Sequence, residues 1–296
     1  MILLRRIRGR LRKELAKRRP LQPQLSGYLA GQAIARAILL EQPFLAGRLG
    51  YTESRCLDSV DEHGRAPARV RDELWEGPGV FPPTEDHFIA FQRTYLGALG
   101  EVDLLGLLGT MDERRLIERH ARSPLTCKLE DLEPYFSPCP WSKFLNEKRI
   151  LVVHPFVQSV EKQYREHRAQ LFLNSDVLPE FQLQTVKAPQ CVMGNTDGHE
   201  SWSTALDELK NSISHCSFDV AIIGCGAFGL PVGAYVKSLG KVAIHLGGAT
   251  QILFGILGRR WLNRQPFRAL MTPAWRPPLE AERPPRWELH EGGSYW

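Results

Sequence analysis

Mainly apolar runs alternate with helical stretches in the second half of the chain. Residues 149–155, 219–224 and 242–247 are apolar over most of a strand's length, and 181–186 alternate apolar and polar positions. Between them, apolar residues recur at three- and four-residue spacing, as in 202–213. Near-continuous apolar strands that alternate with helices are typical of a parallel sheet covered on both faces. The pattern predicts an α/β fold, Rossmann-like, with a mostly parallel sheet and helices on both faces.

The first half shows the same periods less regularly. Helices are predicted at 28–39, 86–98 and 111–121, and a strand at 44–50. Residues 62–86 are rich in charge, Gly and Pro, which predicts an excursion over the surface, and 123–140 hold four prolines and two cysteines, which predict an irregular connection. We predict a basic N-terminal segment at 1–20, one α/β domain at 21–272 with halves 21–140 and 141–272, and a Pro- and Trp-rich C-terminal tail at 273–296 that packs on the domain.

Positive charge is concentrated at the N-terminus. The formal net charge is +5, yet the first 20 residues hold nine basic side chains and a single acidic one, so the remainder sums to −3. Four apolar residues recur at helical spacing among these arginines: Leu4, Ile7, Leu11 and Leu15. The pattern predicts an amphipathic helix on an anionic membrane surface, with a solvated basic tail as the alternative. No aromatic residues interleave with the basic ones, so we expect no nucleic-acid binding.

Cysteine usage and hydropathy restrict the compartment. Six cysteines lie at wide spacings without a C-x-x-C pair, which excludes a zinc knuckle or a thioredoxin-like site. The uncharged stretch 220–236 contains several glycines and a proline, so it does not predict a membrane span. Arginines interrupt the N-terminal apolar residues, which argues against a signal peptide. We expect reduced thiols in a cytoplasmic protein, peripheral on the inner face of the membrane where residues 1–20 bind it.

Candidate binding residues cluster where the predicted strands end. Ligands of open α/β sheets bind outside the carboxyl ends of strands. Those ends supply Gly50 with Glu53, His154, Gly224 with Gly226, and His245 with Gly247 and Gly248. Glycines let a ligand approach the backbone and leave N–H groups for phosphate oxygens, although a turn alone also explains any one of them.

Basic and glycine-rich patterns extend this phosphate hypothesis. Arg260 follows a helix predicted at 249–257, where it acts as a diphosphate clamp or, alternatively, as a cation that complements a helix C-terminus. Residues 224–229 match G-x-G-x-x-G between a strand and a helix, the dinucleotide pattern. The acidic residue expected at the end of the next strand is missing, because the chain reads H-L-G-G there. An NAD- or S-adenosylmethionine-dependent enzyme therefore remains as the alternative reading.

Three short segments carry a family resemblance. They read G-R-L-G-Y-T-E at 47–53, D-V-A-I-I-G-C-G at 219–226 and K-V-A-I-H-L-G-G at 241–248. Together they resemble the GT-D fold glycosyltransferases of bacterial polysaccharide and glycoprotein assembly, which have an R-x-G-D-x-E segment near the start and a glycine-bearing βαβ unit near the end. The resemblance covers about 40–60 and 145–262. It implies transfer of a sugar from a nucleotide-sugar donor to a growing glycan, with a lipid-linked glycan as one form of the acceptor.

The resemblance also assigns roles. Arg48, Gly50 and Glu53 fall on the family's nucleotide-sugar and metal segment. With the strand-end residues, the candidate nucleotide-sugar contacts are Arg48, Gly50, Tyr51, His154, Gly224, Gly226, Gly247, Gly248 and Arg260, and the candidate catalytic residues are Glu53 and His245.

The chain departs from the family pattern at three of these positions. Tyr51 stands where the family has Asp, His245 where it has an acidic residue, and Gly248 where it has His. A divalent cation prefers several hard oxygen ligands. With Glu53 as its one carboxylate, binding of Mn²⁺ or Mg²⁺ stays an open alternative, and so does a non-catalytic scaffold of polysaccharide assembly.

Overall fold

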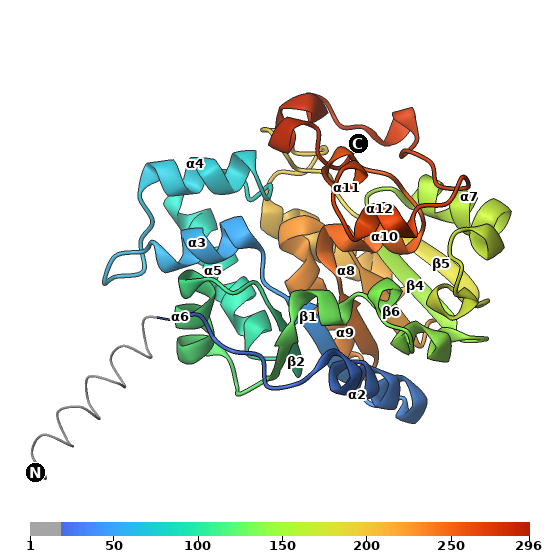
Figure 1. Cartoon of the computed structure of the whole chain (residues 1–296). Coiled ribbons are helices and arrows are strands. Elements are labelled where there is room, and N and C mark those ends of the chain that lie inside the picture. The colour runs from blue at the N-terminus through green and yellow to red at the C-terminus, as the bar shows by residue number, and fades with distance from the viewer. Residues whose placement is uncertain (1–18) are drawn as a thin grey trace, which may run out of the picture.

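A single sheet of seven parallel strands forms the centre of the molecule (Figure 1). The computed structural model describes residues 19–296, and the expected helix over 1–20 lies almost wholly outside them. The strand order is β3-β2-β1-β7-β6-β4-β5. The bounds are β1 Phe44–Arg48, β2 Leu104–Leu107, β3 Leu125–Lys128, β4 Arg149–His154, β5 Gln182–Lys187, β6 Val220–Ile223 and β7 Val242–His245. The predicted α/β class with a Rossmann-like parallel sheet is confirmed.

The apolar strands are continuous because both faces of the sheet are covered. In β4, Ile150 and Val152 belong to one core cluster, while Leu151 and Val153 belong to the other. Neighbouring residues of a strand point to opposite faces, so a strand buried on both sides needs apolar residues at every position. The strands with the clearest apolar runs, β4, β6 and β7, are accordingly interior strands of the sheet.

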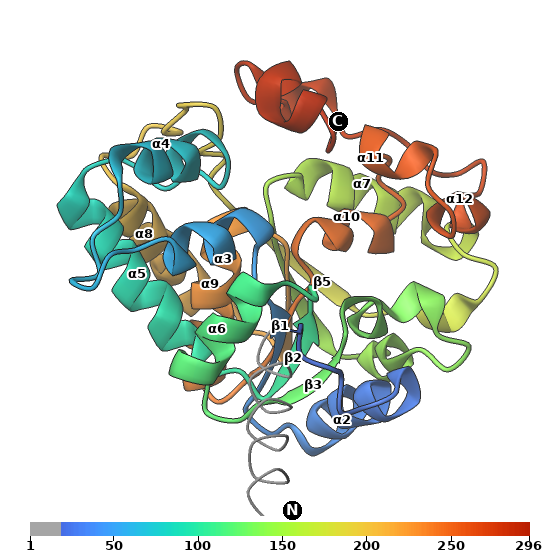
Figure 2. The same cartoon turned by 60° about the vertical axis from the view of Figure 1, so that its left-hand side comes forward.

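Helices form a layer on each face, as Figure 2 shows with α5, α8 and α9 on one side of the strands and α2, α7 and α10 on the other. Their bounds are α2 Gly27–Leu40, α3 Tyr51–Asp58, α4 Ala68–Glu76, α5 Glu85–Leu99, α6 Met111–His120, α7 Val157–His167, α8 Trp202–Ser214, α9 Gly229–Ser238, α10 Thr250–Leu253, α11 Arg259–Leu262 and α12 Phe267–Leu270. None of the helices in residues 19–296 has the length and apolarity needed to cross a membrane.

The structure corrects the sequence prediction in three places. The stretch 62–86 contains helix α4, which buries Val70 and Leu74 one turn apart. The connection expected at 123–140 contains strand β3. The helix expected at 249–257 ends after the four residues of α10. Gly255 there has a φ of +62°, and Ile256 pairs with Arg276 in an isolated β-bridge, so the helix cannot continue.

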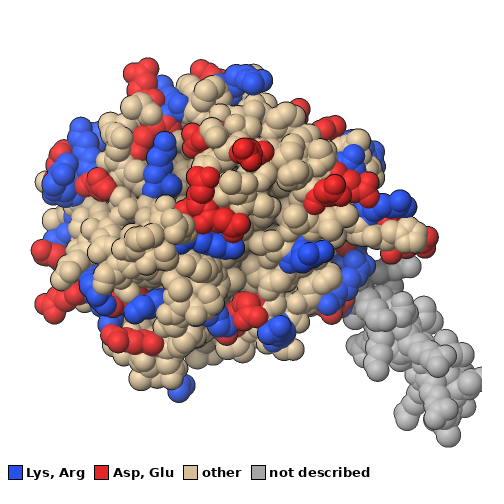
Figure 3. All heavy atoms as spheres, turned by 180° about the vertical axis from the view of Figure 1, so that it is seen from behind, with Lys and Arg blue, Asp and Glu red and all other residues tan. Residues whose placement is uncertain are grey.

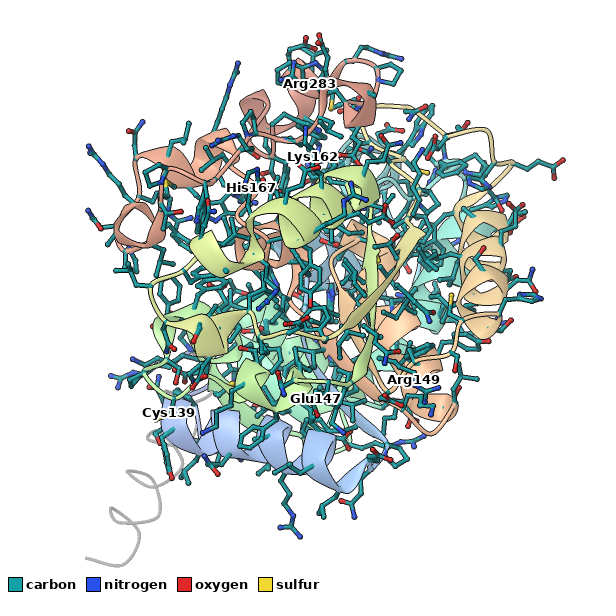
Figure 4. The ribbon with its side chains drawn as sticks, turned by 90° about the vertical axis from the view of Figure 1, so that its right-hand side faces the viewer. Cys139, Glu147, Arg149, Lys162, His167 and Arg283 are labelled. Atoms are coloured by element: carbon teal, nitrogen blue, oxygen red, sulfur yellow. The ribbon has the colours of Figure 1, made fainter. Side chains whose placement is uncertain are left out.

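The last residues of the chain lie over the carboxyl ends of the strands. Figure 4 labels Arg149, the first residue of β4, and Arg283, in this C-terminal part, at opposite ends of the molecule. The C-terminal part is anchored at α7: the buried carboxylate of Glu282 accepts hydrogen bonds from the backbone N–H groups of Gln158, at 2.7 Å, and of Ser159, at 3.2 Å. A carboxylate at a helix N-terminus satisfies free N–H groups and complements the helix dipole.

Candidate functional site

A cavity of about 360 Å³ lies at the carboxyl ends of β1, β4, β6 and β7. The chain leaves β4 through α7 on one face of the sheet and leaves β6 through α9 on the other face. Because β4 and β6 are neighbours whose connections run in opposite directions, a crevice opens between their ends. This switch point is where open α/β sheets bind their ligands, and the volume falls within the range of small-molecule sites.

All eleven candidate residues line this one cavity. They are Arg48, Gly50, Tyr51, Glu53, His154, Gly224, Gly226, His245, Gly247, Gly248 and Arg260. Their positions in the chain span more than 200 residues, yet the parallel topology brings the strand ends to one edge. Tyr51 lies at the rim, since it is 58% exposed, whereas Glu53 is only 7% exposed.

The end of β1 places a buried carboxyl group beside an arginine. Glu53 occupies the first turn of α3, and its carboxylate lies so close to the Cα of Gly50 that a Cβ there would overlap it. Burial raises the pKa of Glu53, while its own backbone N–H and the charge of Arg48 partly offset that rise. A carboxyl group whose pKa moves toward neutrality is suited to proton transfer.

Arg48 is the arginine whose charge acts on both Glu53 and His245. Its Nε donates to the carbonyl of Leu49 at 2.9 Å. Within residues 19–296 its guanidinium forms no ion pair. Part of its donor capacity therefore remains for an anionic ligand in the cavity, for which a guanidinium is well shaped.

Two buried histidines line the cavity as different neutral tautomers. Nδ1 of His154 accepts the backbone N–H of Phe156 at 2.9 Å, so in the neutral ring Nε2 carries the proton. Nδ1 of His245 faces the carbonyl of Ile223 at 3.3 Å, which can only accept, so its Nε2 carries the lone pair. Burial lowers the pKa of each ring to about 3, with Arg48 adding to the effect at His245. At neutral pH both rings are uncharged, one a donor at Nε2 and the other an acceptor.

The glycine-rich turns expose backbone N–H groups to the same cavity. Gly226 and Gly247 have φ values of +54° and +63°, which turn the chain sharply after β6 and β7. Among the hydrogen bonds of residues 19–296, the N–H groups of Gly226, Gly247 and Gly248 have no acceptor. Gly247 is buried and Gly248 is half-buried, so their N–H groups need a partner, whereas Gly226 is exposed and its N–H can also bond to water. Phosphate oxygens are suitable acceptors for all three.

The third glycine of the G-x-G-x-x-G pattern has another role. A Cβ on Gly229 would overlap the imidazole of His245, so this glycine makes room for the ring against helix α9. In dinucleotide sites the third glycine serves close packing of helix and strand. Here the packing partner is the side chain of His245 at the end of the neighbouring strand β7, which accounts for the glycine without any ligand.

None of the predicted site residues lies in the C-terminal segment 287–296, which nevertheless supplies a wall of the cavity. Glu291, Tyr295 and Trp296 line the cavity. The hydroxyl of Tyr295 accepts from Arg260 at 2.6 Å, and the carbonyl of Tyr295 accepts from Gln251 at 3.2 Å. These contacts join residues that are 35 and 44 positions apart in the chain, so no local sequence pattern predicts them.

Two loops also line the cavity without having been predicted. They comprise Gly77 with Pro78 and residues 189–192. A Cβ on Gly79 would overlap the backbone of Cys191, so the two loops touch. The first loop falls within the surface excursion predicted at 62–86, but nothing in the sequence indicated that it faces the cavity.

The donor set does not resemble a ready metal site. In the described part of the chain, no three His, Cys, Asp or Glu side chains are grouped so that they could hold a metal ion. Glu53, the expected metal contact, already accepts its own backbone N–H and lies in a buried position. These residues do not fit a divalent cation on their own.

A scan against models of protein families found no match for this chain, and neither did searches of curated proteins and of solved structures.

Proposed function

We propose that this protein binds a nucleotide sugar and transfers its sugar to a glycan acceptor. One observation carries the proposal: the unpaired N–H groups of Gly226, Gly247 and Gly248 line the same cavity as Arg48 and Arg260. Free backbone N–H groups beside guanidinium groups match the oxygens of a diphosphate. The resemblance of the same segments to GT-D glycosyltransferases suggests sugar transfer as the type of reaction.

Glu53 is the general base in this proposal. Sugar transfer requires that a group accept the proton of the acceptor hydroxyl while the departing diphosphate is stabilised. The buried carboxyl of Glu53, whose pKa is raised, is a stronger proton acceptor than an exposed glutamate. His245, whose pKa is lowered to about 3, is a weak one. We therefore assign the proton to Glu53 and give His245 a hydrogen bond to the substrate.

The leaving group is held by charge and by backbone dipoles. Arg48 and Arg260 approach the cavity from β1 and from α11, and the glycine-rich turns close it from β6 and β7. His154 adds an Nε2–H donor. Because these residues do not fit a divalent cation, no step is assigned to a metal.

The place of the reaction is also part of the proposal. We propose a cytoplasmic protein that binds the inner face of an anionic membrane through its basic N-terminal residues, close to a lipid-linked glycan. The body does not add to this charge: Figure 3 shows acidic and basic side chains interspersed over the face it draws. Vesicles that contain anionic lipid should bind the full chain and lose most of that binding when residues 2–19 are deleted.

The central test is a thermal-shift panel. Nucleotide sugars, free nucleoside diphosphates, NAD(P) and S-adenosylmethionine are each added to the full chain, with and without Mn²⁺ or Mg²⁺. A ligand that binds only the folded state at about 100 times its Kd stabilises it by about 2.7 kcal/mol. We expect that effect from a nucleoside diphosphate species. Stabilisation by NAD(P) or S-adenosylmethionine alone would overturn the proposal, and no response to any compound would favour the scaffold.

Neighbouring arginines provide a matched control for the panel. Arg260 lines the cavity, whereas Arg259 lies over the ring of Trp287 and does not. Arg260→Ala should reduce the response to nucleoside diphosphates, and Arg259→Ala should retain it. Equal losses in the two variants would show that the response does not come from this cavity.

A further inference from the structure

The guanidinium of Arg260 is oriented mainly by aromatic residues. It donates to the hydroxyl of Tyr295 at 2.6 Å, and its Cζ lies 4.8 Å from the centroid of the Tyr295 ring and 5.4 Å from that of Trp261. Tyr295 is itself fixed, because its carbonyl accepts from Gln251 and a Cβ on Gly248 would overlap its ring. These contacts with aromatic side chains hold Arg260 at the cavity wall and involve no carboxylate.

A carboxylate from the same wall nevertheless lies against it. Oε2 of Glu291 is 3.5 Å from Arg260 and accepts the hydroxyl of Ser294 at 3.0 Å. The side chains of Arg260 and Glu291 are 34% and 48% exposed. A half-exposed ion pair of this kind is worth no more than about a fivefold change in an equilibrium constant. A ligand anion with several oxygens can displace it.

The backbone at Glu291 is unusual for a residue with a side chain. Its φ is +46°, and Gly292 and Gly293 follow with φ values of +67° and +71°. Three successive left-handed residues at a cavity wall, one of them not glycine, hold a strained local conformation. The strained residue is also the one that brings the negative charge to Arg260.

We propose that Glu291 is an internal anion of the cavity: its carboxylate pairs with Arg260 in the free protein and gives way when a phosphate group of the ligand binds there. This inference rests on the proposed function, because it assumes that Arg260 contacts a diphosphate. Glu291 thereby lowers the affinity for phosphate-bearing ligands and selects those with enough charge to displace it. The charge of Glu291 also raises the pKa of Glu53, although burial is the larger cause of that rise.

Binding of inorganic pyrophosphate to the full chain tests the inference by isothermal titration calorimetry. Glu291→Gln removes the competing charge, so the Kd for pyrophosphate should fall about three- to fivefold, the range of a half-exposed ion pair. Glu288→Gln is the matched control, because Glu288 lies in the same segment but does not line the cavity. It should leave the Kd unchanged. If Glu291→Gln lowers the melting temperature by more than a few degrees, Glu291→Ala serves as the second variant, with the same expectation.

The outcomes separate the two proposals. Pyrophosphate that binds with Arg260 dependence but with equal or weaker affinity in the Glu291 variants would overturn the internal anion and leave the nucleotide-sugar proposal standing. Absence of pyrophosphate and nucleoside diphosphate binding in every variant would overturn both. A lower Kd in Glu288→Gln as well would assign the effect to net charge and overturn the role of Glu291.

Discussion

Acidification should destabilise this protein through His154 and His245, and the size of the effect follows from their burial. Both rings are uncharged in the folded state, with pKa values lowered to about 3 from an ordinary 6.5, whereas in the unfolded chain they titrate normally. Below pH 6.5 the unfolded state therefore binds protons that the folded state does not. The stability due to the neutral rings is complete above pH 6.5 and is lost as the pH falls toward 3.

The predicted loss of stability at pH 5 does not depend on the exact pKa of the two histidines in the folded state. A pH of 5 lies 1.5 units below the ordinary histidine pKa of 6.5. Since one pKa unit corresponds to about 1.36 kcal/mol, each buried ring lowers the free energy of unfolding by about 2 kcal/mol at this pH. The same number results for any folded-state pKa below about 4. The two rings together should remove about 4 kcal/mol between pH 7.5 and 5.

A comparison of variants isolates this effect from opposing ones. Burial raises the pKa of Glu133 to about 7, so that carboxyl adds stability as the pH falls through 7 toward 4.5, and the total curve is a sum of both signs. Urea unfolding at pH 7.5 and at pH 5 is therefore compared between the wild type and the variants His154→Gln and His245→Gln. Each variant should lose about 2 kcal/mol less than the wild type. His63→Gln, which removes an imidazole that is 65% exposed, is the control substitution.

Two results would refute the reasoning. One is a pH-dependent loss in His154→Gln and His245→Gln equal to that of the wild type. The other is a direct titration: if the ring nitrogens of either histidine in the folded protein change their ¹⁵N chemical shift with a midpoint near 6.5, the ring is not held neutral.

Three further predictions address the site. Gly229→Ala forces a methyl group against the imidazole of His245 and should lower the free energy of urea unfolding by about 1–3 kcal/mol. The double variant with His245→Ala should recover most of this loss, and losses that simply add would count against the contact. Tyr295→Phe removes the hydroxyl that accepts from Arg260 and should weaken binding of a nucleoside diphosphate about tenfold by calorimetry, while an unchanged Kd would show that Arg260 needs no such support. Glu53→Gln should keep donor binding and lower the rate of sugar transfer by about 10²-fold or more, and a turnover like that of the wild type would exclude Glu53 as the base.

Part of the interior of the sheet was predictable, because a strand buried on both faces is apolar at nearly every position. β4, β6 and β7 are interior strands, and their apolar runs stand out. β2 and β3 are four residues each, and β3, at the sheet edge, shows only two buried positions. Length alone does not explain the difference, because β6 and β7 are also four residues long. Strand β2 reads L-L-G-L without a β-branched residue, and β3 has exposed residues at both ends, so neither stands out as a strand in the sequence.

The site was predictable to the extent that topology alone creates it. Once the strands are parallel, their carboxyl ends must meet at one edge, and Glu53, His154 and Gly224 follow from that rule. The wall formed by Tyr295 does not follow, because its bond to Arg260 depends on how an irregular segment crosses the sheet. Such long-range contacts between irregular segments leave no periodic signal.

The contact between Gly229 and His245 constrains how this protein can diverge. A side chain at position 229 is tolerated only once position 245 has given up its ring, because both cannot occupy the same space. The reverse order passes through an overpacked intermediate. Descendants that lose the glycine should therefore already carry a small residue at 245, so the two positions, sixteen residues apart, are expected to covary among relatives. In this chain the third glycine of the pattern is explained by a side-chain contact, so its presence is not by itself evidence of a cofactor site.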